Sequence, residues 1–253
     1  MKIDLNNKTA LVTGATGELG PVIARTLAGS GADIIIHYFK NEAMAQRLQQ
    51  EIESLGRKSI TVQANVSDTE SVMRMKEAVL SRFKSPDIVV ANAVSQYSWT
   101  SVLDQSVDDY VDQFNSSVLQ AVNLAKAFVP GMVERQSGRV IAINTECSMQ
   151  NYPTQSAYVA GKRGMDGVYR VLAKEIGEHQ ITVNQVAPGW TISGRDRANQ
   201  TERNEAYEKT VPLKRRGTDQ EIANVVAFLA SDLASFITGA YIPVSGGTVM
   251  PAI

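Results

Sequence analysis

The sequence predicts a single-domain α/β protein built on a doubly wound parallel sheet of about seven strands, with helices on both faces. Two observations predict this fold. Short runs rich in Val and Ile alternate with longer amphipathic segments over most of the 253 residues, and a glycine-rich turn follows the first run. A chain of this length can bury one substantial core. No internal repeat or linker in the sequence marks a second domain, so we expect residues 1–253 to form one unit.

Seven apolar runs are the predicted strands. Most of them are apolar at consecutive positions, which indicates strands covered by helices on both sides, as in a parallel sheet. They are residues 10–12, 34–36, 60–62, 88–90, 140–143, 181–183 and 241–244. The segments that we predict to be helices include 41–55, 69–83, 156–177 and 219–230.

One stretch interrupts the alternation. Residues 189–211 are polar and follow the sixth predicted strand. Loops of this length in a compact domain are usually either lids or flexible segments. Because open α/β sheets bind ligands at the carboxyl ends of their strands, we expect a substrate lid around residues 190–211, with a flexible loop as the alternative.

Charge and composition argue against several classes of function. Lys and Arg total 25 and Asp and Glu total 26, so we expect neither a nucleic-acid partner nor a polybasic membrane contact. One cysteine and two histidines exclude an intrachain disulfide and leave little for a metal site or a Ser–His–Asp triad. The first residues contain no apolar signal core and no run is long enough to span a membrane, so we expect a cytoplasmic protein.

The turn at residues 13–20, Thr-Gly-Ala-Thr-Gly-Glu-Leu-Gly, joins the first predicted strand to a helical pattern. Glycines at such a turn let the backbone approach a pyrophosphate, and the helix N-terminus supplies N–H donors. Three glycines at this spacing also occur in ordinary tight turns. The position after the first strand favours a dinucleotide site.

The end of the second predicted strand bears on which dinucleotide binds. An NAD site places Asp or Glu there for the ribose hydroxyls. Here the strand ends in His37, Tyr38, Phe39 and Lys40, and Asp33 lies at its other end. Lys40 can pair with a 2′-phosphate, which favours NADP over NAD. The alternative is that Lys40 is a solvated surface lysine.

Tyr158 and Lys162 stand at positions i and i+4 of a predicted helix and therefore share one face. A nearby ammonium favours the phenolate and lowers the pKa of a tyrosine, so the pair can exchange a proton with a carbonyl or an alcohol oxygen. Thr145 follows the strand at 140–143 and can hold the substrate oxygen. Each feature alone is weak, because such pairs arise by chance and a threonine after a strand often only caps a turn.

Together these segments resemble the short-chain dehydrogenase/reductase family, in its compact branch. The matching motifs extend over nearly the whole chain and are residues 13–20, Asn92-Ala93, 138–141, Tyr158-x-x-x-Lys162, 183–189, 228–232, 237–239 and Gly246-Gly247. The likeness is greatest to 3-oxoacyl-carrier-protein reductases and to glucose or other sugar dehydrogenases. It implies a Rossmann-like domain, a nicotinamide cofactor, a small-molecule carbonyl or alcohol substrate, and a homotetramer or homodimer.

The resemblance also implies roles for individual residues. The implied catalytic set is Tyr158, Lys162, Thr145 and Ser117. The implied dinucleotide site comprises Gly14, Thr16, Gly17, Glu18, Leu19, Gly20, Tyr38, Lys40, Asn65, Val66, Asn92, Ala93, Tyr158, Lys162, Pro188, Gly189 and Thr191. The implied substrate pocket contains Val94, Gln96, Asn151, Tyr152 and Trp190, with Tyr97, Trp99 and Met149 nearby.

Several positions depart from the family pattern, and three of them bear on nucleotide binding and proton transfer. Glu18 stands where compact members commonly have glycine, Val94 replaces a glycine beside the cofactor, and Ser117 replaces an asparagine that anchors a water. These departures leave a second hypothesis open, a catalytically weakened member that binds nucleotide as a sensor or scaffold. The intact Tyr158 and Lys162 favour an enzyme that interconverts a carbonyl and a secondary alcohol.

Glycines recur in the predicted helix that carries Tyr158, at positions 161, 164 and 167. Each glycine inside a helix costs about 1 kcal/mol relative to alanine. Their spacing therefore indicates close packing of this helix against the sheet, against another subunit or against a local neighbour.

Overall fold

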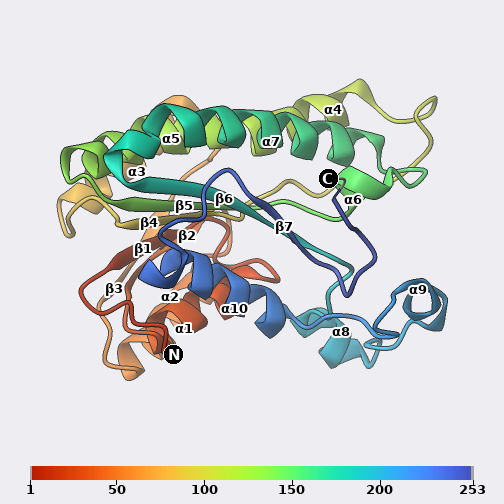
Figure 1. The fold of residues 1–253 in the computed structure, drawn as a ribbon, viewed down its shortest axis with the longest axis horizontal. Coiled ribbons are helices and arrows are strands. Elements are labelled where there is room, and N and C mark those ends of the chain that lie inside the picture. The colour runs from red at the N-terminus through yellow and green to blue at the C-terminus, as the bar shows by residue number, and fades with distance from the viewer. Residues whose placement is uncertain (1, 252–253) are drawn as a thin grey trace.

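Seven parallel strands form one sheet in the computed structural model, which describes residues 2–251 (Figure 1). The strand order is β3-β2-β1-β4-β5-β6-β7. The strands are β1 (Thr9–Val12), β2 (Asp33–Tyr38), β3 (Ser59–Gln63), β4 (Ile88–Ala91), β5 (Gly138–Ile143), β6 (Ile181–Pro188) and β7 (Tyr241–Val244). Each predicted strand is present, which confirms the doubly wound α/β fold.

The central strands are buried on both faces. Every residue of β1, β4, β5 and β6 is buried. In the register of the sheet, Leu11 lies between Ile35 of β2 and Val89 of β4. These branched side chains pack well on a pleated surface that helices cover from both sides.

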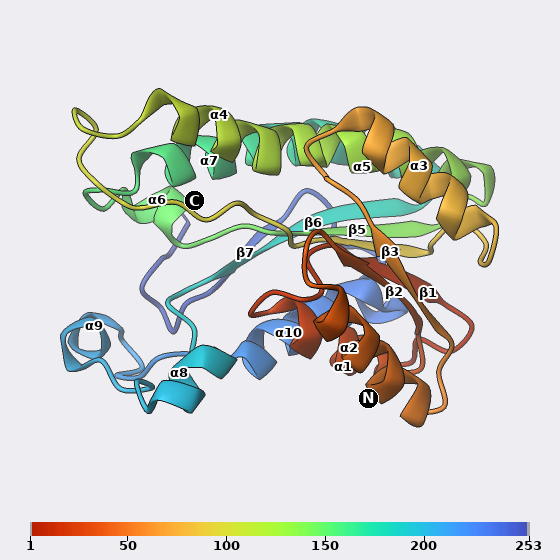
Figure 2. The same cartoon turned by 180° about the vertical axis from the view of Figure 1, so that it is seen from behind.

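Helices form a layer on each side of the sheet (Figures 1 and 2). One layer contains α1 (Gly20–Gly29), α2 (Glu42–Ser54) and α10 (Asp219–Ala230). The other contains α3 (Thr69–Leu80), α4 (Val107–Phe114), α5 (Gln120–Glu134) and α7 (Ser156–Ile176). Each layer encloses its own cluster of buried apolar side chains. Within the described range, no helix is long and apolar enough to cross a membrane.

The order of the strands reverses between β1 and β4, so the carboxyl ends of these two strands open a crevice at one edge of the sheet. Thr13 joins the two ends. Its Oγ1 accepts hydrogen bonds from the backbone N–H of Asn92 at 2.9 Å and of Ala93 at 3.1 Å, and donates to Gln120 Oε1 at 2.9 Å. The crevice therefore has a rigid floor.

The polar segment after β6 contains two short helices, α8 (Gly194–Asn199) and α9 (Glu205–Thr210), which extend beyond the carboxyl edge of the sheet (Figure 1). The buried Arg216 guanidinium organises this segment. It donates to the Asp196 carboxylate at 3.0 Å and to the backbone oxygen of Thr201 at 2.9 Å. The predicted long loop is thus a hydrogen-bonded structure in this conformation, and its action as a lid stays a prediction.

Candidate active site

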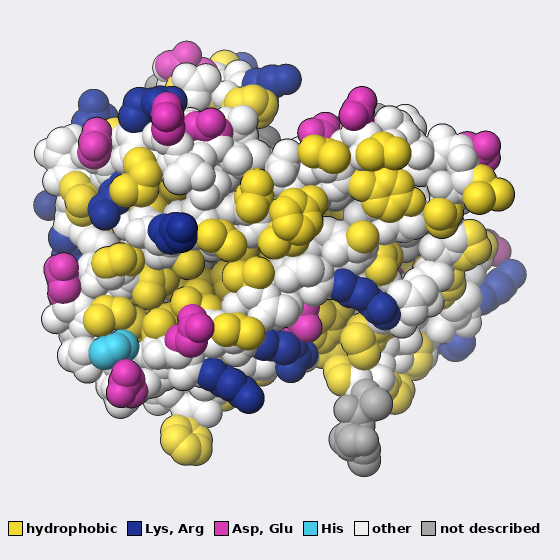
Figure 3. All heavy atoms as spheres, turned by 90° about the horizontal axis from the view of Figure 1, so that it is seen from above, with side chains coloured by type: hydrophobic (Ala, Val, Ile, Leu, Met, Phe, Trp, Pro, Cys, Tyr) yellow, Lys and Arg dark blue, Asp and Glu magenta, His cyan; other side chains and the backbone are white. Residues whose placement is uncertain are grey.

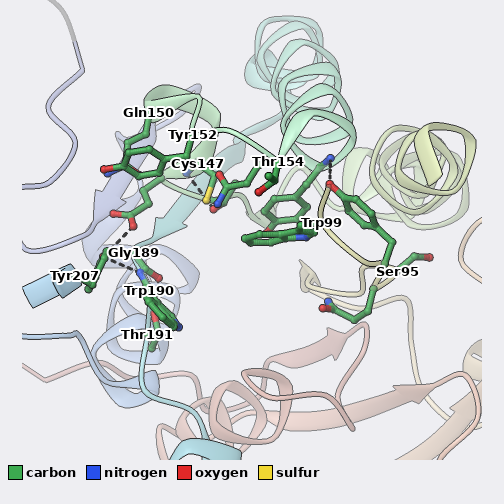
Figure 4. Close-up of a pocket in the computed structure, with 16 residues that line it drawn as sticks. Ser95, Trp99, Cys147, Gln150, Tyr152, Thr154, Gly189, Trp190, Thr191 and Tyr207 are labelled. Atoms are coloured by element: carbon green, nitrogen blue, oxygen red, sulfur yellow. Dashed lines mark hydrogen bonds between the residues drawn. The ribbon is translucent and has the colours of Figure 1, made fainter. Parts of the chain in front are cut away.

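Two adjoining cavities open at the carboxyl edge of the sheet. The larger, of about 960 Å³, extends from the glycine-rich turn to the segment after β6, and the smaller, of about 670 Å³, lies beside it (Figure 4). Residues that line both cavities form their boundary. They are Ser95, Gln96, Thr145, Tyr158, Gly189, Trp190 and Thr191. Tyr158 and Thr145 therefore face a dinucleotide-sized cleft and a second pocket at once.

The glycine-rich turn fits a phosphate-binding role. Gly14 has φ +60°, and a Cβ there would lie 2.8 Å from the Cα of Ala93. Gly20 begins α1, and a Cβ on it would overlap the carbonyl oxygen of Gly14. Thr16, Gly17, Glu18 and Leu19 line the larger cleft, whereas Gly20 lies behind the turn.

The first turn of α1 keeps its N–H groups free of side-chain caps. Its N-cap residue, Leu19, makes no side-chain cap bond, while Asn41, Asp68 and Thr218 cap α2, α3 and α10. Uncapped N–H groups and the positive end of the helix dipole attract anions. Since α1 points this end at the larger cleft, the residues present fit the pyrophosphate of a dinucleotide.

His37 lines the larger cleft, and the sequence did not single it out as a site residue. Its ring is buried, its Nδ1 accepts a hydrogen bond from the N–H of Gly14 at 3.0 Å, and its Nε2 lies 3.0 Å from the backbone oxygen of Ala64. Burial lowers the pKa of His37 to about 4, so the ring is neutral near pH 7. The neutral imidazole with Nε2–H fits both bonds and joins the glycine-rich turn to the end of β3.

The end of the larger cleft that lies beyond β2 and β3 is lined by Phe39, Lys40, Asn65 and Val66. Tyr38 lies instead in the hydrophobic core, because successive strand residues point to opposite sides and His37 and Phe39 take the cleft side. This placement differs from the prediction for Tyr38. Lys40 is exposed, and its Nζ lies 5.2 Å from the centre of the Phe39 ring.

The carboxylate of Asp33 lies at the amino end of β2, away from the cleft. It accepts a hydrogen bond from the N–H of Lys58 at 2.9 Å and pairs with Arg57 at 3.7 Å. The residues Phe39, Lys40 and Asn41 that line this part of the cleft carry no carboxylate. A positive charge with no carboxylate among these three lining residues is the arrangement expected for a 2′-phosphate.

Tyr158 and Lys162 lie on one face of α7. Lys162 is buried, its Nζ donates to the backbone oxygen of Ile143 at 2.6 Å, and it lies 5.8 Å from the centre of the Tyr158 ring. Burial lowers the pKa of Lys162 to about 8 and raises that of Tyr158 above its usual value. Hydrogen bonding with the Thr145 hydroxyl lowers the pKa of Tyr158 and so opposes the effect of burial. A lowering of that pKa by Lys162 stays a prediction.

Two contacts position Tyr158, one at its backbone and one at its ring. Its backbone N–H donates to the hydroxyl of Tyr97 at 2.8 Å, and the Trp99 ring stacks on it with a centre-to-centre distance of 6.1 Å. The start of α7 and the loop after β4 therefore set where the phenol oxygen lies.

Ser117 belongs to a π-helical turn, Asn115–Leu119, between α4 and α5. Such turns often occur at functional sites. The Oγ of Ser117 is buried and has no hydrogen-bond partner within residues 2–251. Ser117 lines neither of the two cavities. The neighbouring Ser116, which no sequence motif indicates, lines the larger cleft.

The predicted substrate residues divide between the two cavities. Gln96, Tyr152 and Trp190 line the smaller cavity, together with Tyr97 and Trp99. Val94, with Asn92, Ala93 and Pro188, lines the larger cleft instead. Met149 and Asn151 line neither of the two cavities. Asn151 ends α6 (Cys147–Gln150) with its backbone in a left-handed conformation.

Sequence reasoning missed several members of the smaller cavity. They are Glu146, Gln150, Gln155 and Tyr207. Glu146 directly follows Thr145, which was the one available signal. Its burial depends on α9, because the Tyr207 hydroxyl donates to Glu146 Oε1 at 2.9 Å.

Comparison with known proteins gives consistent matches over nearly the whole chain. A family model described as enoyl-(acyl carrier protein) reductase matches residues 14–249. The 3-oxoacyl-[acyl-carrier-protein] reductase FabG of Staphylococcus epidermidis is 36% identical over 246 residues, covering 96% of this chain and 100% of the relative. The protein of the same name in Pseudomonas aeruginosa is 35% identical over 248 residues, covering 98% and 100%.

Two solved structures are similar in fold. The promiscuous reductase LugOII, which catalyses keto-reduction at C1 during lugdunomycin biosynthesis, has a TM-score of 0.89 and 30% identity over 97% of this chain and 99% of its own. A 7α-hydroxysteroid dehydrogenase complexed with NADH and 7-oxo glycochenodeoxycholic acid has a TM-score of 0.88 and 26% identity, over 99% and 97%.

Proposed function

This chain belongs to the short-chain dehydrogenase/reductase family and is an NAD(P)-dependent oxidoreductase of carbonyl and alcohol groups, and on that premise we propose that Tyr158 is its acid and base. The observation that carries the proposal is the position of Tyr158 at the boundary of the two cavities. When bound, the dinucleotide supplies or accepts the hydride. The protein then has to manage one proton at the substrate oxygen.

The side chains around Tyr158 support this proton transfer. In reduction its phenol donates a proton to the carbonyl oxygen, and in oxidation it removes the proton of the alcohol. The Thr145 hydroxyl orients the same oxygen. The Lys162 ammonium, held by the backbone oxygen of Ile143, stabilises the negative charge that forms on Tyr158. Ser117 takes part in a relay that supplies a proton to Tyr158 from solvent after reduction and returns it to solvent after oxidation, and Ser116 on the same turn assists it.

The larger cleft supports dinucleotide binding along its length. Gly14 and Gly17 let the backbone approach the pyrophosphate closely, and the uncapped N–H groups in the first turn of α1 hold it. Asn65 and Val66 flank the adenine, and Lys40 pairs with the 2′-phosphate, so NADP is preferred over NAD. Pro188, Gly189 and Thr191 line the opposite end, beside Tyr158 and Lys162, and receive the nicotinamide.

The experiment that tests the role of Thr145 uses a matched pair of variants. Thr145→Val removes the hydroxyl and keeps the shape, and Thr145→Ser keeps the hydroxyl. We expect Thr145→Val to lower kcat for a ketone by about 10- to 100-fold with NADPH binding unchanged, and Thr145→Ser to stay close to the parent. Equal losses in both variants would reject a role for the hydroxyl.

The substrate enters the smaller cavity as a small molecule with a carbonyl or alcohol group. The two short helices α8 and α9 act as its lid, since Trp190, Thr191 and Tyr207 of this segment line the cavity. Closure of the lid excludes water from the proton transfer.

A homo-oligomer is supported by the outer face of the helical layer that contains α4, α5 and α7, on which apolar side chains gather (Figure 3). Val107, Val111 and Phe114 of α4 and Val171 of α7 are at least half exposed. Exposed apolar patches of this kind often form subunit contacts. Sedimentation of the purified protein tests this, and a dimer or tetramer of the 27.5 kDa chain is the expected result.

We expect the enzyme to work in the cytoplasm. The sequence contains one cysteine, Cys147, which fits a protein that needs no disulfide in a reducing compartment. Cell fractionation with an antibody against the purified protein tests the location.

A further inference from the structure

Three polar side chains of the smaller cavity have buried atoms without a hydrogen-bond partner within residues 2–251. They are Glu146 Oε2, Gln155 Oε1 and both amide atoms of Gln150. We propose that they form a polar subsite that binds hydroxyl groups of the substrate, so that the substrate is a neutral polyhydroxy compound. This inference rests on the proposed function and names the substrate class for the same site.

Such atoms are costly to leave unpaired. An unsatisfied buried donor or acceptor destabilises the folded state, and most buried polar atoms in proteins are hydrogen-bonded. Glu146 is 3% exposed and Gln155 is 8% exposed. Because both side chains line the cavity, a ligand in the cavity is placed to supply the missing partners after small side-chain rotations.

The chemistry of the unpaired atoms selects the ligand. Oε2 of Glu146 and the Oε1 atoms of Gln150 and Gln155 are acceptors, and Nε2 of Gln150 is the one donor. Three acceptors and one donor match hydroxyl groups, each of which can donate and also accept. A plain acyl or hydrocarbon chain would leave all four atoms unpaired.

Charge excludes another class of ligand. The lining residues of the smaller cavity include the carboxyl group of Glu146 and no Lys or Arg. The Glu146 carboxylate would repel a phosphate or a carboxylate in this cavity. The subsite therefore favours a neutral ligand over an anionic one.

Glu146 is the anchored member of the subsite. The Tyr207 hydroxyl holds Glu146 Oε1 at 2.9 Å, and the backbone N–H of Glu146 donates to Pro188 O at 2.9 Å. A Cβ at Gly189 would lie 3.0 Å from Glu146 Oε2, so only glycine leaves this oxygen its room. One oxygen of Glu146 is thus anchored and the other is left for a ligand.

Aromatic rings complete the recognition of a polyol. Figure 4 shows Gln150, Tyr152 and Tyr207 on one side of the cavity, with Trp99 across from them. Rings of this kind cover the C–H faces of a hydroxylated ring, while polar groups at one end bind its hydroxyls.

The test compares three alcohols of one carbon skeleton: cyclohexanol, trans-1,2-cyclohexanediol and 1,2,3-cyclohexanetriol. Binding is read from tryptophan fluorescence in the presence of NADP⁺, because the two tryptophans of the chain, Trp99 and Trp190, both line the cavity. Oxidation of each alcohol is followed in parallel as formation of NADPH. We expect the Kd of the triol to be lower than that of cyclohexanol by about tenfold or more, since each added hydroxyl gains a hydrogen bond.

Variants test which residues cause the preference for the triol. Gln150→Met and Glu146→Gln should each reduce the preference for the triol over cyclohexanol to about threefold or less. Gln46→Met makes the same chemical change on the exposed surface of α2 and should keep the full preference. Unchanged melting temperatures would show that the variants are folded.

The outcomes separate the two proposals. Binding of the triol and cyclohexanol to the parent with equal Kd would overturn the subsite, whatever the turnover. A strong binding preference for the triol without oxidation of any alcohol would support the subsite and contradict the proposed role of Tyr158.

Discussion

Arg195 Nη2 lies 3.2 Å from Glu18 Oε1, an ion pair that joins α8 to the glycine-rich turn. Both residues line the larger cleft. Glu18 is a departure from the family pattern, and an unpaired carboxylate there would repel a pyrophosphate. The guanidinium of Arg195 offsets that charge, which explains how this turn tolerates a glutamate.

Loss of Arg195 alone should therefore weaken nucleotide binding more than loss of both Arg195 and Glu18. We expect Arg195→Ala to raise the Kd for NADPH by about 3- to 5-fold, since exposed pairs contribute up to about 1 kcal/mol. The double variant Glu18→Ala with Arg195→Ala should recover most of this loss. Titration of NADPH at low and high salt measures both effects, and a double variant as weak as Arg195→Ala would refute the compensation.

The preference for NADP should depend on Lys40. In Lys40→Glu, a carboxylate replaces the ammonium at the adenine end, so we expect the ratio of the Kd values for NADPH and NADH to rise by about tenfold or more. Lys58→Glu makes the same change at the amino end of β3, where it should leave the ratio unaltered. Titration of both nucleotides measures the ratio, and tighter binding of NADH by the parent would contradict the assignment.

His37 should make the folded state sensitive to acid. The unfolded chain binds a proton at this residue near pH 6.5, and the folded chain does so only near pH 4. Between these values the free energy of unfolding should fall by about 3 kcal/mol as the pH decreases, with no loss from this residue above pH 6.5. Urea unfolding of the parent and His37→Asn across this range measures it. If the free energy of unfolding depends on pH in the same way in both proteins, His37 does not cause the sensitivity to acid.

The glycines of α7 give a matched pair of stability tests. A Cβ at Gly161 would lie 2.7 Å from the backbone oxygen of Gln113, whereas one at Gly167 would have nothing within 4 Å. We expect Gly161→Ala to lower the free energy of unfolding by about 1–3 kcal/mol, and Gly167→Ala to raise it by up to about 1 kcal/mol. Thermal unfolding compares them, and equal effects would refute the contact with Gln113 at the end of α4.

Most of the sheet could be predicted because its strands are buried on both faces and read as short Val- and Ile-rich runs. Short elements escaped prediction. Helices α6, α8 and α9 have four to six residues, too few for a helical period to be visible. The packing of Gly161 and Gly164 against α4 and the π-helical turn also depends on tertiary neighbours that the glycine spacing alone leaves undetermined.

The candidate site could be predicted where short motifs carry it, as in the glycine-rich turn and the Tyr158 and Lys162 pair. Tyr38 and Phe39 show one limit of prediction from sequence, because successive strand residues point to opposite sides. Tyr38 therefore lies in the core while Phe39 lines the cleft. Glu146 shows another. Its burial and its unpaired oxygen arise from contact with Tyr207, which lies 61 residues away in the chain.

The central claim is that the phenol oxygen of Tyr158 carries the proton at the junction of the two cavities. The most direct test measures kcat for reduction of a ketone, together with the Kd for NADPH, in the parent and in Tyr158→Phe, which keeps the ring and removes the oxygen. We predict a fall in kcat of at least about 100-fold with the Kd for NADPH within about twofold of the parent. A Tyr158→Phe enzyme that reduces the ketone as fast as the parent would contradict the claim.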